Sequence, residues 1–388
     1  MGSLTSAPVL RLKCYKNTAS ILKVPLRWSS THLKCSEKLL AQPADHTFDY
    51  LTPTPSHLLN ITLADILPKE CYPSGFNTSN LALPHVPFPS KESGPSTHPQ
   101  IPQGHHLVYF SPQVLGKDLL SDGTDPLQSP GPPFLRRMWA GGSLLYPTNK
   151  SQQLRSDRTR STCRESIAKV ELKGTGTDEK VFVTIDRHIT KGSEDVSQDF
   201  DSKNVAMLEK RNLVFFQEIT PEEASERANR PGKILTVPSK FVPDIRVPIT
   251  PTKTLLARFS ALSFNAHGIH LDPQYCREKE GYKNLLVHGP LSLILMLSVL
   301  RNQIGKNIVY KFDYRNLAPL YVDETMNVCV QRNQEYLDSK SPKQRKYDVW
   351  IEGSGGGFAV KGTALVGPLG ESDEFVYDSI DEMSESLV

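Results

Sequence analysis

The hydrophobic pattern of the second half of the chain is organised around one very apolar stretch. Residues 289–305 (GPLSLILMLSVLRNQIG) are apolar on almost every side of a helix, which predicts a helix that is buried all round. Segments rich in β-branched and aromatic residues follow it and predict strands at 308–317, 324–333, 347–353 and 357–367. The SGGG between the last two predicts a hairpin turn, because a phosphate-binding loop would be followed by a helix and not by a strand.

The first half of the chain has a Pro-rich part and then a β-rich part. Residues 51–67 predict a turn followed by a short helix, and the prolines of 83–106 predict an extended loop, since proline fixes φ and lacks an N–H. Strand patterns then appear at 136–147, 161–174, 180–189 and 212–219. The polar segment 221–233, which contains Pro and Gly, predicts a domain boundary.

Two short segments lie between this boundary and the apolar helix. Residues 253–262 (KTLLARFSAL) predict a strand. Residues 272–281 (DPQYCREKEG) predict a short helix, with Asp272 at the N-cap, Pro273 at the first helical position and Gly281 beyond the end.

An apolar helix followed by long antiparallel strands is buried only if the sheet wraps around it, which is the hot-dog arrangement. The β-rich first half predicts a second copy, so the fold class is α+β, a double hot dog. The first copy lacks an equally apolar helix. We expect four parts: a leader at 1–40, a degenerate N-terminal hot-dog domain with Pro-rich loops at 41–225, a catalytic hot-dog domain at 226–370, and an acidic tail at 371–388.

The first 35 residues carry six Lys or Arg and no acid. This pattern is typical of a mitochondrial transit peptide and predicts a mitochondrial matrix protein. The alternative is a basic tail without structure. The whole chain has a formal net charge of +3, which becomes −3 without those six cations. A charge so close to balance gives no indication of nucleic-acid binding.

The six cysteines are scattered and show no metal-ligand spacing, which indicates a reducing compartment. The longest nearly unbroken apolar run, 291–300, is too short to span a bilayer. His105 and His106 lie in the Pro-rich part without a partner motif and are assigned no role. The sequence leaves the oligomeric state open, and a homo-oligomer is compatible with it.

Candidate chemistry is concentrated in residues 258–290. This block, RFSALSFNAHGIHLDPQYCREKEGYKNLLVHGP, resembles the hydratase-2 (MaoC-like) motif, in which Asp-x-Asn-Pro-x-His is followed by His-Gly. It resembles still more the mitochondrial hydroxyacyl-thioester dehydratases of type 2 and their mesaconyl-CoA hydratase relatives. Two other segments support the resemblance, RRMWAGGSLLYP (136–147) and FDYRNLAPLYVDETMNV (312–328).

The resemblance implies reversible dehydration of (R)-3-hydroxyacyl thioesters to trans-2-enoyl thioesters in mitochondrial type II fatty-acid synthesis. A base removes the C2 proton, an acid protonates the leaving hydroxyl, and N–H groups stabilise the thioester oxygen. The substrate is carried by acyl carrier protein or by CoA. No organic cofactor or metal is implied, because the thioester already acidifies C2.

Matched position by position, the family histidine falls on His270 and the family aspartate on Asn265. The His-Gly pair falls on His288 and Gly289, and the Asn-Pro pair on His267 and Gly268. We therefore expect catalytic roles for His270 (base), Asn265 (orienting water or hydroxyl) and Gly289 (N–H donor). His288, His267 and Asp272 are expected to bind substrate.

Each of these residues also has a purely structural alternative. His270 fits a hydrogen-bonded core histidine, Asn265 a turn cap, Asp272 an N-cap, and His288 a residue that shapes the turn before the helix. An amide cannot accept a proton at neutral pH, so Asn265 leaves the base role to His270 alone. Two other functions remain open: a CoA-dependent hydratase of a short branched acyl-CoA, and a non-catalytic hot-dog protein that binds acyl chains or a partner.

Overall fold

The computed structural model describes residues 36–86, 98–192, 205–334, 336 and 343–370. The expected leader at 1–40 lies outside the described residues except for 36–40, which are helical. The expected acidic tail at 371–388 lies wholly outside them.

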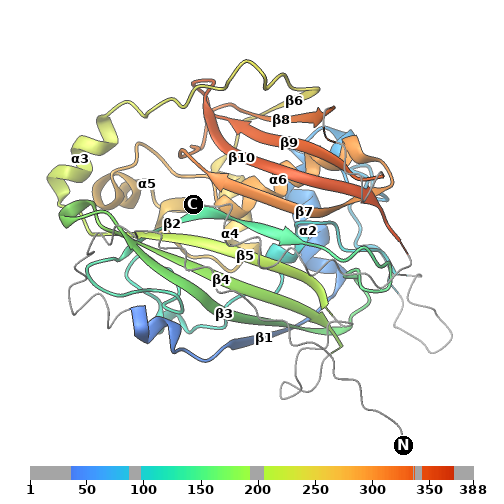
Figure 1. The fold of residues 1–388 in the computed structure, drawn as a ribbon, viewed down its shortest axis with the longest axis horizontal. Helices are drawn as coiled ribbons and strands as arrows, with labels where there is room; N and C mark the ends of the chain where they lie inside the picture. Colours follow the sequence, from blue (N-terminus) through green and yellow to red (C-terminus); the bar gives the residue numbers. More distant parts are fainter. Residues whose placement is uncertain (1–35, 87–97, 193–204, 335, 337–342, 371–388) are drawn as a thin grey trace, which may run out of the picture.

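The described strands form one ten-stranded sheet in which each neighbouring pair is antiparallel (Figure 1). Strands β2 and β7 pair at its middle and join five strands of the first half to five of the second. The order across the sheet is β1 (Asp45–Tyr50), β3 (Arg160–Lys173), β4 (Lys180–Lys191), β5 (Val205–Phe216), β2 (Arg136–Leu145), β7 (Asn307–Asn316), β10 (Phe358–Pro368), β9 (Arg345–Glu352), β8 (Met326–Asn333) and β6 (Ile245–Ile249).

Helix α6 (Gly289–Ile304) lies inside the curve of the second half-sheet and contacts β7, β8, β9 and β2. Its residues 291–300 are all buried, as the apolar pattern predicts. Leu293, Leu297 and Leu300 are at most 2% exposed. The sheet therefore wraps a buried helix, and the hot-dog prediction is confirmed for this half.

The first half has a similar set of strands around a less apolar helix, α2 (Pro53–Ala64), which confirms the short helix predicted in 51–67. Helix α2 packs against α4 (Lys253–Leu262) and the 3-10 turn His105–Val108. Leu59 of α2 shares one hydrophobic core with Leu297 of α6, so the two halves are packed together. The domain boundary near 225 stays a prediction.

The strand predicted at 253–262 is wrong, because these residues form α4. Their buried positions, Leu255, Leu256, Phe259 and Ser260, repeat at the spacing of a helix and not at the alternation of a strand. The Thr252 side chain caps the helix by accepting a hydrogen bond from Leu255 N over 3.1 Å.

The other strand predictions correspond to observed strands, and the SGGG hairpin joins β9 to β10. Two strands at the edges of the sheet, β1 and β6, were not predicted. Both are short, and Pro248 in β6 is tolerated because an edge strand has one unpaired side.

The helix predicted after Asp272 is confirmed as α5 (Pro273–Tyr275), which continues as the π-helical turn Cys276–Glu280. It ends at Gly281, whose φ of 72° is left-handed and favours glycine. The polar boundary segment contains one helix, α3 (Pro221–Asn229), with a capping box between Thr220 and Glu223.

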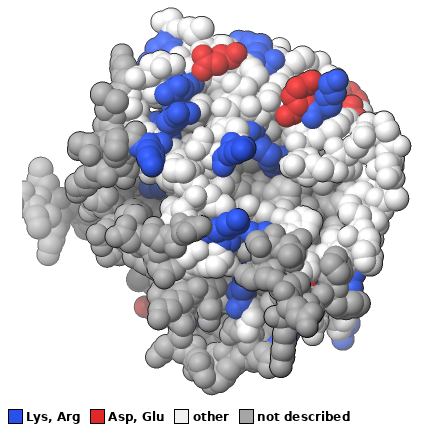
Figure 2. All heavy atoms as spheres, turned by 90° about the vertical axis from the view of Figure 1, so that its right-hand side faces the viewer, with Lys and Arg blue, Asp and Glu red and all other residues white. Residues whose placement is uncertain are grey.

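Within the described ranges, no helix has the length and apolar character needed to cross a bilayer. Figure 2 shows the end of the molecule that lies at the right of Figure 1. On the part of this face that is not grey, Lys and Arg side chains are more prominent than Asp and Glu. This end of the described surface therefore offers positive charge to an anionic partner.

Candidate active site

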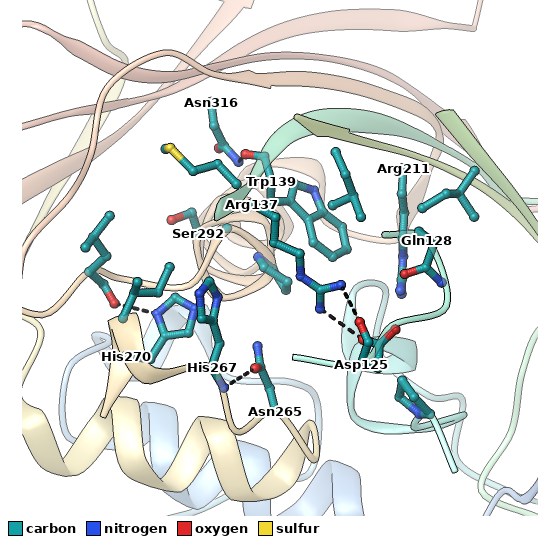
Figure 3. A pocket seen from close by; sticks show the side chains of 18 of the residues that line it. Asp125, Gln128, Arg137, Trp139, Arg211, Asn265, His267, His270, Ser292 and Asn316 are labelled. Carbon is teal, nitrogen blue, oxygen red and sulfur yellow. Dashed lines mark hydrogen bonds and ion pairs between the residues drawn. The ribbon is translucent and has the colours of Figure 1, made fainter. Parts of the chain in front are cut away.

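A cavity of about 160 Å³ lies where the two halves of the molecule meet. The first half contributes Arg137 and Trp139 from β2, and the second half contributes the loop after α4 and the start of α6. Figure 3 shows side chains from both halves turned toward this space. Of the six predicted site residues, four line it: Asn265, His267, His270 and Gly289.

His270 ends the 3-10 turn Gly268–His270, and its ring is held from one side. Its Nδ1–H donates to the carbonyl of Leu286 over 2.8 Å, because a carbonyl only accepts. Burial lowers the pKa of His270 to about 4, although the bond to Leu286 opposes that change. The imidazole is therefore neutral at pH 7, with the lone pair on Nε2, which is the form a general base needs.

His288 does not line the cavity but supports His270 from behind. The two rings are stacked with centroids 3.6 Å apart and planes 20° apart. Nε2 of His288 is hydrogen-bonded to Ser260 Oγ over 2.9 Å, which ties the ring to α4. Burial lowers the pKa of His288 well below its usual value, so it stays uncharged beside His270. This geometry supports a positioning role and not the expected contact with substrate.

Asn265 lies at the turn that leads into the histidines. Its Oδ1 accepts a hydrogen bond from the backbone N–H of His267 over 2.9 Å, which closes the turn. Phe264 before it has a φ of 52°, which this turn holds in the left-handed region. Because Oδ1 is occupied, the Nδ2 group is the part of Asn265 available to a ligand, and in Figure 3 it points into the cavity. Asn265 therefore both caps a turn and faces the cavity.

Gly289 begins α6 and lies against Trp139 of the first half. A Cβ at this position would lie 2.9 Å from Trp139 Cβ and 2.9 Å from Asn316 Nδ2, so a larger residue does not fit without movement. The first N–H groups of a helix have no partner within the helix, and Pro290 has no N–H. The N–H of Gly289 and the helix dipole thus favour a negative oxygen at this end of the cavity.

His267 lies on the cavity wall beside His270, with ring centroids 5.6 Å apart. Burial, followed by the charges of His270 and Arg137, lowers its pKa well below the usual value. Asp272 lies elsewhere: it is exposed and caps α5 through hydrogen bonds from Gln274 N and Tyr275 N. The expected substrate contact of Asp272 is not supported, because its carboxylate is used for capping outside the cavity.

Several cavity residues come from the Pro-rich and β-rich first half and were not predicted as site residues. Arg137 forms an ion pair with Asp125 at 2.9 Å, as Figure 3 shows. Deeper in, Arg187 bonds Glu165 at 2.9 Å and Glu209 at 2.7 Å. Burial alone would raise the pKa of Glu209, but Arg211 and Arg187 hold it well below its usual range. No motif marks these residues, because each is charged, isolated in sequence and brought in by the fold.

Among the described residues, no three or more His, Cys, Asp or Glu side chains are grouped so that they could hold a metal ion. What the cavity offers is one oriented neutral imidazole, a helix N-terminus and an amide, all facing the same small space. This set suits proton transfer next to a carbonyl whose oxygen becomes negative.

Three curated proteins are similar to this chain over most of their length. A relative from Schizosaccharomyces pombe, the mitochondrial hydroxyacyl-thioester dehydratase type 2, is 27% identical over 73% of this chain and 88% of its own length. The mesaconyl-C(4)-CoA hydratase of Chloroflexus aurantiacus is 28% identical over 63% of this chain and 79% of its own length. The mitochondrial hydroxyacyl-thioester dehydratase type 2 of Saccharomyces cerevisiae is 27% identical over 58% of this chain and 75% of its own length.

The fold is that of a MaoC-like dehydratase from Phytophthora capsici, whose crystal structure superposes with a TM-score of 0.54 at 13% identity. The match covers 87% of this chain and 99% of that one, so it spans both halves and confirms the double hot dog. The model of the family "hydroxyacyl-thioester dehydratase type 2" matches residues 104–322, a range that contains all the cavity residues except Asp45, Thr47 and Val360. The chain belongs to the hydroxyacyl-thioester dehydratase type 2 family.

Proposed function

We propose that this chain catalyses the reversible dehydration of (R)-3-hydroxyacyl thioesters to trans-2-enoyl thioesters. One observation carries the proposal: His270, neutral and fixed by Leu286, faces the same cavity as the N-terminus of α6. A base and an oxyanion site in one space are what removal of a proton next to a thioester carbonyl requires.

In the dehydration direction, Nε2 of His270 takes the C2 proton while the Gly289 N–H donates to the thioester oxygen. The developing negative charge on that oxygen is stabilised by the donor and by the helix dipole. The Nδ2–H of Asn265 donates to the C3 hydroxyl and holds it in position. The C3–O bond then breaks, and the hydroxyl takes a proton from a second acid–base group on the cavity wall beside His270, so that it leaves as water.

A second cavity of about 460 Å³ is proposed to hold the acyl group. It shares Arg137, Trp139 and Asn265 with the catalytic cavity, so the two are continuous at the reacting end. Its remaining wall contains many apolar side chains: Leu107, Phe110, Val114, Leu119, Phe264 and Leu271. Apolar walls suit an alkyl chain.

A third cavity, of about 550 Å³, is proposed to hold the phosphorylated arm of the carrier. It shares the wall residues 318–320 with the catalytic cavity. Its lining includes Arg227, Arg230, Lys233 and Lys283, of which Arg230 is paired with Glu226 and Lys283 with Glu324. CoA and acyl carrier protein both present a phosphopantetheine arm, so positive charge here serves either. Lys233→Glu tests this assignment through a higher KM for both carriers.

For the carrier itself, we propose acyl carrier protein in the mitochondrial matrix. The support is the naming of two relatives as mitochondrial dehydratases and the acid-free basic pattern of 1–35. Residues 1–40 fused to a fluorescent reporter are expected to direct it to mitochondria. A diffuse cytosolic reporter would remove this part of the proposal.

A second candidate is a hydratase of a short, branched acyl-CoA. The relative named mesaconyl-C(4)-CoA hydratase favours it, and so do the charged Arg137, Arg187 and Arg211 in the cavity wall. Charged groups suit a short acyl group with a polar end better than a long alkyl chain.

The experiment is hydration of trans-2-enoyl thioesters by the purified protein, with CoA and acyl-carrier-protein substrates compared at several chain lengths. Formation of the (R)-3-hydroxyacyl product supports dehydratase activity, and the ratio of kcat/KM values chooses between the two candidates. Absence of turnover on every carrier would leave a non-catalytic acyl-binding protein and contradict the proposal.

A further inference from the structure

The hydratase-2 motif has an aspartate where this chain has Asn265, and the nearby Asp272 caps α5 outside the cavity, so the motif itself supplies no carboxylate to the site. The structure brings one in from the first half of the chain. Asp122 is buried, with its side chain 5% exposed, and its Oδ2 lies 3.4 Å from Nε2 of His267. Within the described residues neither of these two atoms has a hydrogen-bond partner.

We propose that Asp122 is the carboxylate of this active site and that it makes His267 the second proton carrier of the reaction. His267 would act on the substrate, and Asp122, which does not line the cavity, would act through His267 as a positioning residue. This inference rests on the dehydratase function proposed above.

The contact between the two segments is built into the backbone. The N–H of Gly268 donates to the Asp122 carbonyl over 2.8 Å. Gly123 has a φ of 84°, and a Cβ there would lie 2.2 Å from the Ala266 carbonyl oxygen, so only glycine allows the approach.

The Asp122 side chain is also aimed by its own turn. Its Oδ1 accepts hydrogen bonds from Thr124 N at 2.9 Å and from Thr124 Oγ1 at 2.6 Å. That leaves Oδ2 as the free oxygen, turned toward His267. Because Nε2 of His267 faces Asp122, Nδ1 is the ring nitrogen left for the cavity.

Charge explains why a carboxylate is needed here. A 3-hydroxyacyl thioester loses a proton at C2 and a hydroxide at C3, so the site must hold one proton for the leaving group while a second group accepts the C2 proton. Burial lowers the pKa of both His267 and His270, which opposes holding any proton. His288 and Arg137 also face these rings and add no negative charge. The Asp122 carboxylate, 3.4 Å from His267, supplies the negative charge that favours the protonated form of this ring.

His270 Nε2 takes the C2 proton as the C2–H bond breaks, and the C2–C3 double bond forms as the C3–O bond breaks. His267 is held by Asp122 in its protonated form, with Nε2–H toward the carboxylate. Its Nδ1 gives a proton to the departing oxygen, which leaves as water, and the ring becomes neutral. A proton then returns from His270 to His267 through solvent, so no net proton is consumed. Hydration is the reverse, with His267 accepting the proton of water.

The test compares Asp122→Asn with Asp272→Asn. Both substitutions turn a carboxylate that accepts backbone N–H bonds into an amide, but only Asp122 faces a histidine. Measured in the dehydration direction, in which His267 must hold its proton, Asp122→Asn should lower kcat at pH 7.5 by at least ~10-fold with little change in KM, and should move the alkaline limb of the pH–rate profile to lower pH. Asp272→Asn should leave the profile where it is. An unchanged profile for Asp122→Asn, with or without loss of rate, overturns the proposal.

A double-mutant cycle with His267→Asn adds a second criterion. If Asp122 acts only through His267, the double variant should be no slower than His267→Asn alone. Additive losses would show that Asp122 has a separate structural role.

A measurement without turnover separates this proposal from the function on which it rests. NMR titration of the ring of His267 in the wild-type protein and in Asp122→Asn should show a lower pKa in the variant. An equal pKa in the two proteins refutes the pairing even in an active enzyme. A lower pKa in a protein that hydrates no enoyl thioester would sustain the pairing and refute the dehydratase function.

Discussion

The Nδ1 atom of His270 donates its hydrogen bond to the carbonyl oxygen of Leu286, 2.8 Å away. Leu286 is bridged to Tyr321, and its own N–H donates to the Ile269 carbonyl, so the acceptor is part of rigid backbone. The bond fixes both the ring orientation and the tautomer. The proton-accepting nitrogen of the site is therefore set by the fold before any substrate binds.

Asn265→Asp should change the pH dependence of the reaction. A carboxylate at this turn would lie on the cavity wall near His270 and His267, and an opposite charge raises the pKa of an imidazole. Since the base must be neutral, the acidic limb of kcat/KM should move to higher pH. An acidic limb that stays in place in Asn265→Asp would show that the position does not face the base.

Asn265→Ala should reduce kcat by less than removal of the His270 ring, because only a hydrogen bond is lost.

Gly289→Ala should reduce kcat more than it raises KM. The added Cβ would meet Trp139 and Asn316 at 2.9 Å, which displaces the N–H that faces the thioester oxygen. Loss of one such donor typically costs ~10²–10³-fold in kcat. Gly353→Ala is a control for kcat, since a Cβ there meets nothing closer than 3.9 Å and the residue lies in the third cavity, away from the reacting end. Equal kinetics for Gly289→Ala and the wild type would remove Gly289 from the site.

Leu297→Ala should destabilise the protein by ~2–5 kcal/mol, because it leaves a cavity in the helix around which the sheet is wrapped. Leu317→Ala, at a position that is 41% exposed, should cost far less. Urea unfolding of both variants measures the difference. Similar costs at the two sites would contradict the assignment of α6 as the central helix.

Stability should fall as the pH is lowered from about 6.5 toward 5. Burial depresses the pKa of His270 and His288 in the folded state, while the unfolded chain titrates near the ordinary value of ~6.5. The unfolded state then binds more protons below that pH, so the free energy of unfolding decreases. The depressed pKa of Glu209 acts only below about 4.5, outside this window. His270→Gln should make the decline shallower, and exposed His85→Ala should not. A flat profile between pH 7 and 5 would show that these rings titrate normally.

The sequence predicted the parts of the fold that depend on local pattern. Helix α6 is apolar all round, and its strands follow in regular order, so both could be predicted. Helix α4 was predicted as a strand although Leu255, Leu256 and Phe259 stand at helical spacing, so its period could have been recognised from the sequence. The edge strands β1 and β6 are short and carry charged or proline residues.

The same distinction applies to the site. His270, Asn265 and Gly289 lie within one motif and are brought together as expected. Asp122, Asp125 and Arg137 come from the first half, and only the packing of that half onto the α4–α6 region places them near the histidines. Charged residues of this kind carry no local pattern, so no rule of periodicity or capping could have singled them out.

The central claim is that His270 moves the C2 proton, and the most direct test is hydration of a trans-2-enoyl thioester by the wild-type protein and by His270→Ala. His85→Ala serves as the control for loss of an exposed histidine, and circular dichroism verifies the fold of each variant. Positioned acid–base groups typically contribute ~10²–10⁴-fold, so kcat/KM of His270→Ala should fall by at least ~10²-fold while His85→Ala stays at the wild-type value. A folded His270→Ala protein that hydrates the substrate at the wild-type rate would contradict the account.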